Sequence, residues 1–103
     1  MFYTESIEAK IDRHSGFYNQ GQTLRLKCRG SGYPPPAVTW MRDGKVMTSG
    51  DRIKVNGGDL VVRRLGIQDS GTYICNVDNG RTMDKAYTSV RITTPGKVYF
   101  DFK

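Results

Sequence analysis

Few residues of this 103-residue chain have the type and spacing that catalysis or metal binding requires. The only cysteines, Cys28 and Cys75, lie far apart, and His14 is the sole histidine. Zinc sites need cysteines and histidines at short spacings, so no metal site is expected. One histidine without a Gly-x-Ser-x-Gly segment gives no catalytic triad, and no glycine-rich phosphate loop precedes a helical pattern. We therefore predict a protein that is not an enzyme and holds no cofactor.

Positive charge is the other chemical signal. The chain carries 16 Lys and Arg against 10 Asp and Glu, a formal net charge of +6. Net charge bears on partners and solubility rather than on fold. Three of the cations, Arg25, Lys27 and Arg29, alternate with Leu26 and Cys28. In a β-strand this spacing places all three on one face.

Alternation of apolar and polar residues with period two dominates the chain, and no stretch has helical periodicity. The predicted strands are residues 6–12, 17–20, 23–29, 37–42, 45–47, 52–55, 60–63, 72–77 and 83–93. Asp43-Gly44 predicts a tight turn, and Asn79-Gly80 predicts a type I′ hairpin turn with positive φ at both residues. Short, regularly spaced strands of this kind are typical of an all-β sandwich or barrel.

Three segments carry a resemblance to a known family. They are Gly21-x-x-Leu24-x-Leu26-x-Cys28, Gly32-x-Pro34-x-Pro36-x-Val38-x-Trp40 and Leu60-x-Val62-x-x-Leu65-x-x-x-Asp69-x-Gly71-x-Tyr73-x-Cys75. This pattern resembles immunoglobulin-superfamily domains, most closely the I-set. The resemblance implies a Greek-key β-sandwich with sheets A-B-E-D and A′-G-F-C-C′. It also implies a single domain over residues 1–95, followed by a tail or linker over residues 96–103.

The resemblance assigns structural roles to several residues. Cys28 and Cys75 are expected to form the disulfide between the sheets; the alternative is a pair of reduced core cysteines, as in intracellular muscle members of the set. The remaining assignments are Trp40 packed on the bridge, Leu26 and Leu65 in the core, the Tyr73 hydroxyl bonded to backbone between residues 65 and 69, and an Arg52–Asp69 ion pair.

In the implied sheet order, strands B, E and D are neighbours, so their outward residues share one face. The predicted polyanion-binding residues on this face are Arg25, Lys27, Arg29, Lys54 and Arg63, with Arg52 on the same side and only Glu8 and Asp12 opposing them. The hypothesis is that this face binds heparan sulphate or an acidic protein surface. The alternative is a solvated face without a ligand. Nucleic acid is disfavoured because no aromatic residues alternate with the cations to stack on bases.

The resemblance implies a protein-binding or adhesion module of an extracellular protein: a receptor, a cell-adhesion molecule or a matrix component, secreted or in an ectodomain. One alternative is a cytoplasmic, sarcomeric domain of the titin kind with a structural role, and another is a secreted growth-factor-binding domain. No run approaches the roughly 18–20 apolar residues of a membrane span, so direct membrane insertion is not expected. A homodimer is a further alternative, since Tyr99, Phe100 and Phe102 give the C-terminal segment an aromatic character.

Overall fold

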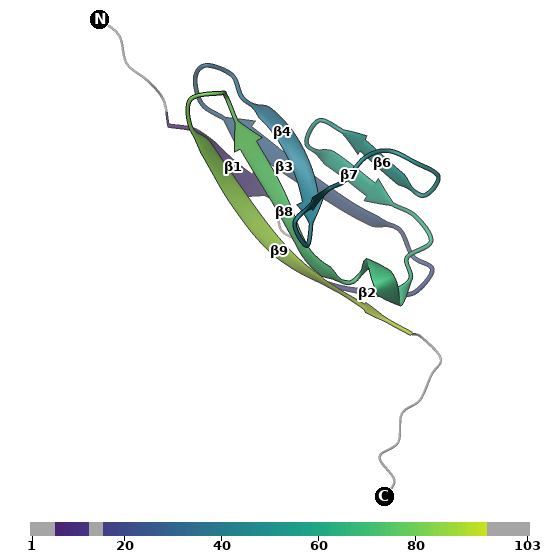
Figure 1. Cartoon of the computed structure of the whole chain (residues 1–103). Helices are drawn as coiled ribbons and strands as arrows, with labels where there is room; N and C mark the ends of the chain where they lie inside the picture. Colours follow the sequence, from purple (N-terminus) through teal and green to yellow (C-terminus); the bar gives the residue numbers. More distant parts are fainter. Residues whose placement is uncertain (1–5, 13–15, 95–103) are drawn as a thin grey trace, which may run out of the picture.

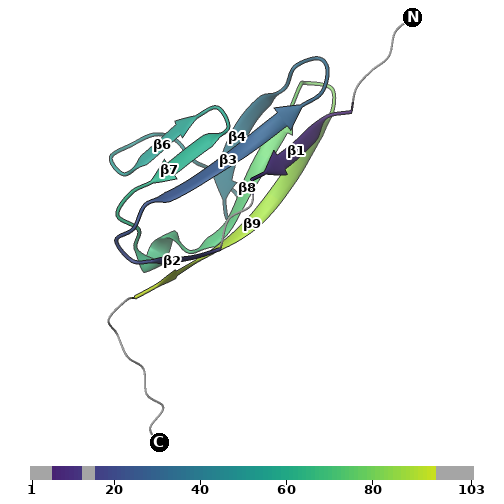
Figure 2. The same ribbon diagram turned by 180° about the vertical axis from the view of Figure 1, so that it is seen from behind.

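The computed structural model describes residues 6–12 and 16–94; the predicted tail at residues 96–103 lies outside them. Within the described residues the chain forms two packed β-sheets (Figures 1 and 2). The strands are β1 (Glu8–Ile11), β2 (Phe17–Asn19), β3 (Leu24–Ser31), β4 (Ala37–Arg42), β5 (Lys45–Val46), β6 (Ile53–Asn56), β7 (Asp59–Val62), β8 (Gly71–Asp78) and β9 (Met83–Thr93). A 3₁₀ turn, η1 (Ile67–Asp69), precedes β8, and no helix of the described residues is long and apolar enough to cross a membrane.

The order of the strands matches the one that the resemblance implied. The first sheet is four-stranded, with order β1-β3-β7-β6, and the second is five-stranded, with order β2-β9-β8-β4-β5. The N-terminal segment contributes to both, because β1 pairs antiparallel with β3 whereas β2 pairs parallel with β9. The prediction of an all-β, immunoglobulin-like sandwich is therefore confirmed.

Two turns show where local sequence did and did not determine the backbone. Asp43 and Gly44 have φ values of 49° and 87°, the pair of positive values that a type I′ turn between β4 and β5 requires. The type I′ prediction for Asn79-Gly80 is wrong, since only Gly80 has a positive φ, at 89°. The loop is longer than a two-residue turn, and the Asn79 side-chain oxygen accepts the N–H groups of Arg81 and Thr82 at 2.8 and 3.0 Å.

The core lies between the sheets, and alternate residues of the central strands build it. The buried apolar residues are Leu24, Leu26, Cys28, Trp40, Leu60, Val62, Leu65, Tyr73, Cys75, Val77, Val90 and Ile92. A disulfide joins Cys28 of β3 to Cys75 of β8 with an S–S distance of 1.94 Å, so it links the two sheets. Trp40 lies directly opposite Cys75 in the β4–β8 register, and its side chain is fully buried.

Gly58, in the turn between β6 and β7, holds the tryptophan and the disulfide strand together. Its carbonyl oxygen accepts a hydrogen bond from Trp40 Nε1 and another from the Cys28 backbone N–H, each at 2.9 Å. A Cβ atom at this position would collide with the Cys28 carbonyl oxygen. Only glycine therefore allows the turn to approach β3 this closely.

Candidate binding face on the first sheet

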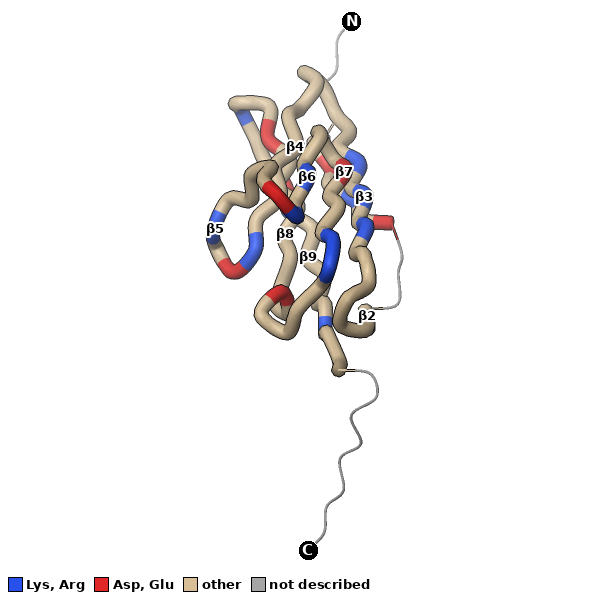
Figure 3. Tube along the Cα trace, turned by 90° about the vertical axis from the view of Figure 1, so that its right-hand side faces the viewer, with Lys and Arg blue, Asp and Glu red and all other residues tan. Residues whose placement is uncertain are grey.

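The predicted basic residues lie on the outer side of the first sheet. Arg25 and Lys27 of β3 alternate with the buried Leu24 and Leu26, so their side chains point away from the core. In the register across β3, β7 and β6, Arg25 and Lys54 lie on either side of Val61. Figure 3 shows Lys and Arg recurring along β3 and again on β6. The sheet thus brings cations from separate segments to one surface.

Two of the predicted cations are paired with carboxylates. Lys27 Nζ lies 3.7 Å from Asp59 Oδ1, and Arg29 Nε lies 3.8 Å from Asp12 Oδ1. The prediction that only Glu8 and Asp12 oppose the positive charge is wrong, because Asp59 of β7 is directly opposite Lys27. Both pairs are exposed, so each contributes little to stability, about 0–1 kcal/mol. Their main effect is to reduce the net charge at this part of the face.

Three of the predicted cations remain uncompensated. Arg25, Lys54 and Arg63, here called the cationic triad, take part in no ion pair among the described residues. Val61 lies between the first two, and a shallow hollow of about 240 Å³ is lined by Val61 and Arg25 together with the paired Lys27 and Asp59. Arg25 and Lys54 are two strand spacings apart, about 10 Å at the backbone. The triad frames an apolar residue with positive charge and is open to solvent.

The sequence hypothesis left out one outward cation. Lys10 of β1 is exposed and lies directly opposite Arg29 in the β1–β3 register. The sequence pattern could have indicated this outward position, because Lys10 alternates with the partly buried Ala9 and Ile11. Like charges facing each other across a ladder destabilise a sheet, which gives the Asp12 carboxylate beside Arg29 a compensating role.

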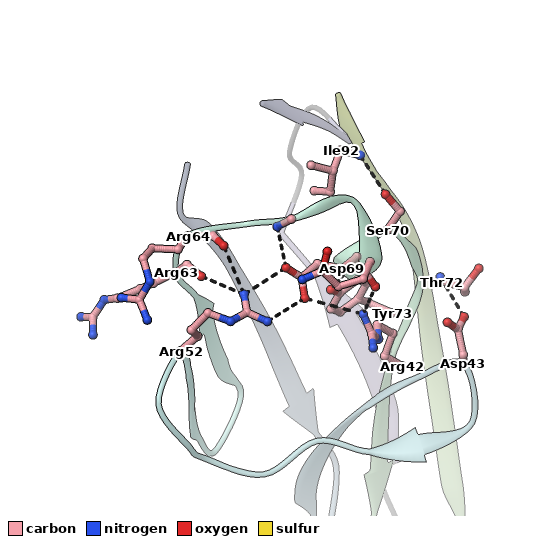
Figure 4. A network of polar contacts seen from close by, with 12 residues as sticks. Arg42, Asp43, Arg52, Arg63, Arg64, Asp69, Ser70, Thr72, Tyr73 and Ile92 are labelled. Atoms are coloured by element: carbon pink, nitrogen blue, oxygen red, sulfur yellow. Dashed lines mark hydrogen bonds and ion pairs between the residues drawn. The ribbon is translucent and has the colours of Figure 1, made fainter. Parts of the chain in front are cut away.

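Arg52 does not belong to this face, contrary to the prediction. Its guanidinium donates two hydrogen bonds to the Asp69 carboxylate, at 3.0 and 3.2 Å, and further bonds to the carbonyls of Arg63 and Arg64 (Figure 4). These acceptors lie at the base of the sandwich and draw the side chain away from the outer surface. Arg52 is consequently part of a structural network.

Asp69 is the centre of that network, and its side chain is almost fully buried. Burial by itself would raise the pKa of Asp69, but the hydrogen bonds from Arg52 and the Gly66 N–H, with the charge of Arg42, hold it below its ordinary value. The Tyr73 hydroxyl donates to the Asp69 carbonyl oxygen at 2.6 Å, within the segment expected for it. Burial raises the pKa of Tyr73, so the phenol stays protonated and remains a donor.

Comparison with known proteins places these features in a family. The family described as "Immunoglobulin domain" matches residues 6–79. The chain belongs to the immunoglobulin domain family. The I-set subtype stays a prediction, because the match does not distinguish it from other sets.

Two curated relatives are similar to this chain in sequence. Human papilin is 38% identical over 72 residues, and the human protein "Cell adhesion molecule DSCAML1" is 40% identical over 79 residues. These matches cover 70% and 73% of this chain but only 6% and 4% of the relatives. The activity of those whole proteins is therefore not shown for this domain.

A solved structure confirms the architecture. A mutant complex between titin and an immunoglobulin domain of obscurin like 1 contains a chain that superposes with a TM-score of 0.74 at 24% identity. The superposition covers 90% of this chain and 99% of the other. At this level of identity the similarity shows the fold alone.

Proposed function

We propose that this immunoglobulin domain is a non-enzymatic protein-binding or adhesion module of a larger extracellular or cell-surface protein. The observation that supports it most directly is the 40% identity to a protein named as a cell adhesion molecule, over 73% of this chain. The Cys28–Cys75 bond agrees with this assignment, because disulfides form and persist mainly in oxidising compartments. The parent protein would be a receptor, an adhesion molecule or a matrix component.

An intracellular structural role of the titin kind is the competing assignment, because a chimeric titin structure is 26% identical to this chain and covers 89% of it. The oxidation state of the two cysteines in the native protein separates the two. The parent protein is collected into an alkylating reagent, denatured and analysed by mass spectrometry without reduction. The extracellular assignment predicts unmodified, bonded cysteines. Alkylated Cys28 and Cys75 would favour the intracellular role.

We also propose that the cationic triad binds a polyanion, with heparan sulphate as the ligand. Three observations support this: the triad has no carboxylate partners among the described residues, its members come from three neighbouring segments of one sheet, and Arg25 lines an exposed hollow. Sulphated polysaccharides present closely spaced anionic groups along a chain. At the backbone, Arg25 and Lys54 lie two strand spacings apart, about 10 Å, and Arg63 lies two residues along the chain from the Val61 between them, about 6.8 Å.

A charge-matched pair of variants tests this ligand on a heparin column. The test variant is Arg25→Gln/Lys54→Gln/Arg63→Gln. The control is Lys45→Gln/Arg81→Gln/Arg91→Gln, which removes the same number of exposed cations away from the first sheet. The triad variant is expected to elute at a clearly lower salt concentration than the control. Equal elution of the two variants would show that heparin responds only to net charge and would remove this candidate.

A further inference from the structure

Two asparagine–glycine pairs occur in the chain, Asn56-Gly57 and Asn79-Gly80, and each lies in the loop between two paired strands. In such a pair the asparagine side chain closes readily on the backbone, because glycine has no side chain to hinder the approach. The glycine nitrogen bonds to the asparagine Cγ, the Cγ–Nδ2 bond breaks, and the proton lost from the glycine nitrogen leaves with the ammonia. Water then opens the cyclic imide to aspartate or isoaspartate. Both products carry a carboxylate where the amide was neutral.

The reacting groups of Asn79-Gly80 are all engaged in hydrogen bonds. The Asn79 side-chain oxygen accepts two backbone N–H groups of its own loop, at 2.8 and 3.0 Å, and Nδ2 donates to the Pro34 carbonyl oxygen at 3.2 Å. The Gly80 N–H donates to the Asp78 carboxylate at 2.7 Å. That negative charge disfavours loss of the Gly80 proton. The hydrogen bonds of the amide also have to break before its Cγ can reach the Gly80 nitrogen, so ring closure is opposed at both reacting atoms.

Asn56-Gly57 has none of these restraints. Both residues are exposed, and neither the Asn56 side chain nor the Gly57 N–H takes part in a hydrogen bond within residues 6–12 and 16–94. Gly57 has a φ of 60°, the positive value that a type II′ turn requires at its first central residue, and no atom lies within 4 Å of the position that a Cβ would take. The pair of Asn56 with Asp59 closes this turn. The peptide between Asn56 and Gly57 therefore has few contacts to lose when it rotates.

We propose that Asn56 is a site of spontaneous deamidation, whereas Asn79 is protected although it has the same neighbour in sequence. The difference comes from the tertiary structure, since the sequence gives both sites the same reactive pair. The reaction needs only water and creates one new carboxylate, which lowers the formal net charge of +6 by one unit. Because the loss of ammonia is irreversible in water, conversion increases with the age of the molecule.

The product changes a turn on which the core depends. Isoaspartate carries the main chain through its Cβ, which inserts one extra carbon into the backbone of the turn. Gly58 of this turn has the carbonyl oxygen that accepts the Trp40 Nε1–H and the Cys28 N–H, each at 2.9 Å. Either product also places a carboxylate at position 56, opposite Asp59 in the β6–β7 register, and like charges directly opposite destabilise a sheet. Deamidation of Asn56 is therefore expected to lower the stability of the domain.

Peptide mapping by mass spectrometry tests the two sites in the same sample. The folded full chain is incubated at mildly alkaline pH, and the asparagine, aspartate and isoaspartate forms of each site are quantified against synthetic peptides. Asn56 is expected to react at least about tenfold faster than Asn79, because more hydrogen bonds have to break at Asn79. The control is the reduced chain unfolded in guanidinium chloride, in which the two sites should react at comparable rates. A sample taken at zero time corrects for conversion during digestion.

Release of the Gly80 N–H tests the cause of the protection. Asp78→Ala removes its carboxylate acceptor and is expected to raise the rate at Asn79 at least about threefold, with the rate at Asn56 unchanged. The matched control is Asp51→Ala, since Asp51 is exposed and takes part in no ion pair among the described residues; it should change neither rate. A rate at Asn79 that does not respond to Asp78→Ala would count against the proposal.

Unfolding in urea tests the consequence of the modification. Converted chains are separated from unreacted chains by ion exchange and should unfold at a lower urea concentration. Asn56→Gln controls for other effects of incubation, because the longer glutamine side chain closes on the backbone far more slowly, and its midpoint should not change with time. Comparable rates at Asn56 and Asn79 in the folded chain, a faster reaction at Asn79, or no conversion of Asn56 would overturn the site. A converted chain with an unchanged midpoint would overturn the link between the site and the core.

Discussion

Replacement of Gly58 by alanine is expected to destabilise the domain strongly, although the turn is remote from any proposed ligand surface. The φ angle of Gly58 is not in the left-handed region, so backbone strain is not the cause. The cause is space, because the new Cβ would collide with the Cys28 carbonyl oxygen. Because β3 is held by the disulfide, the turn has to move away from it.

The magnitude follows from the hydrogen bonds that this movement breaks. The Gly58 carbonyl accepts from Trp40 Nε1 and from the Cys28 N–H, and both donors lie in the buried core. A buried donor left without a partner costs about 1–3 kcal/mol. The smaller entropy of the unfolded alanine chain offsets about 0.4–1 kcal/mol of this. The expected net loss in the free energy of unfolding, summed over the two donors, is about 3 kcal/mol.

Gly50→Ala is the matched control, because Gly50 has an ordinary φ and no atom within 4 Å of the position that the new methyl group would take. Its stability should stay within about 0.5 kcal/mol of the parent domain. Urea unfolding followed by Trp40 fluorescence measures both variants. With a slope of about 1–3 kcal/mol per molar, the Gly58 variant should lose more than about 1 M in midpoint. Gly58→Ala and Gly50→Ala with equal midpoints would refute the packing argument.

Two further predictions concern the network at the base of the sandwich. Tyr73→Phe removes the 2.6 Å hydrogen bond to the Asp69 carbonyl and should lower the free energy of unfolding by about 1–2 kcal/mol, measured by urea unfolding; an unchanged midpoint would contradict it. Asp69 has a lowered pKa when folded, so its stabilising contribution is present above its unfolded pKa and is lost as pH falls through the folded value. Asp69→Asn should therefore be less stable at about pH 7 and lose less stability on acidification, and parallel pH–stability curves for the two proteins would contradict this.

Much of the architecture was predictable because strand faces and turns are encoded locally. Alternating residues gave β4 and β9 their full extents, Ala37–Arg42 and Met83–Thr93, and Asp43-Gly44 gave the turn that follows β4. The predicted end of β3 was less accurate. It runs to Ser31, two residues beyond the prediction, because β1 pairs with this stretch and extends the ladder.

Contacts between distant segments were harder to predict. The outward orientation of Lys27 followed from alternation, but its ion pair with Asp59 depends on the β3–β7 register. For Gly58 the sequence predicted only a position in a turn. Its role as acceptor for Trp40, 18 positions away, arises because tertiary packing brings the β6–β7 turn against β3.

The alignment of β8 with β9 shows how a single wrong turn assignment changes which residues are neighbours on the outer surface. A two-residue type I′ turn at Asn79-Gly80 would pair Asp78 with Arg81 and place Lys85 opposite Ile74. The longer loop instead pairs Asp78 with Met83, which places Tyr87 opposite Ile74. Because side chains alternate with period two, a shift of two residues keeps every inward residue inward and so preserves the pattern of apolar and polar positions. Core patterning therefore cannot distinguish the two registers. The Asn79 side-chain oxygen accepts hydrogen bonds from the Arg81 and Thr82 N–H groups and so stabilises the longer loop. The longer loop in turn determines the β8–β9 register, and with it which outward residues face each other.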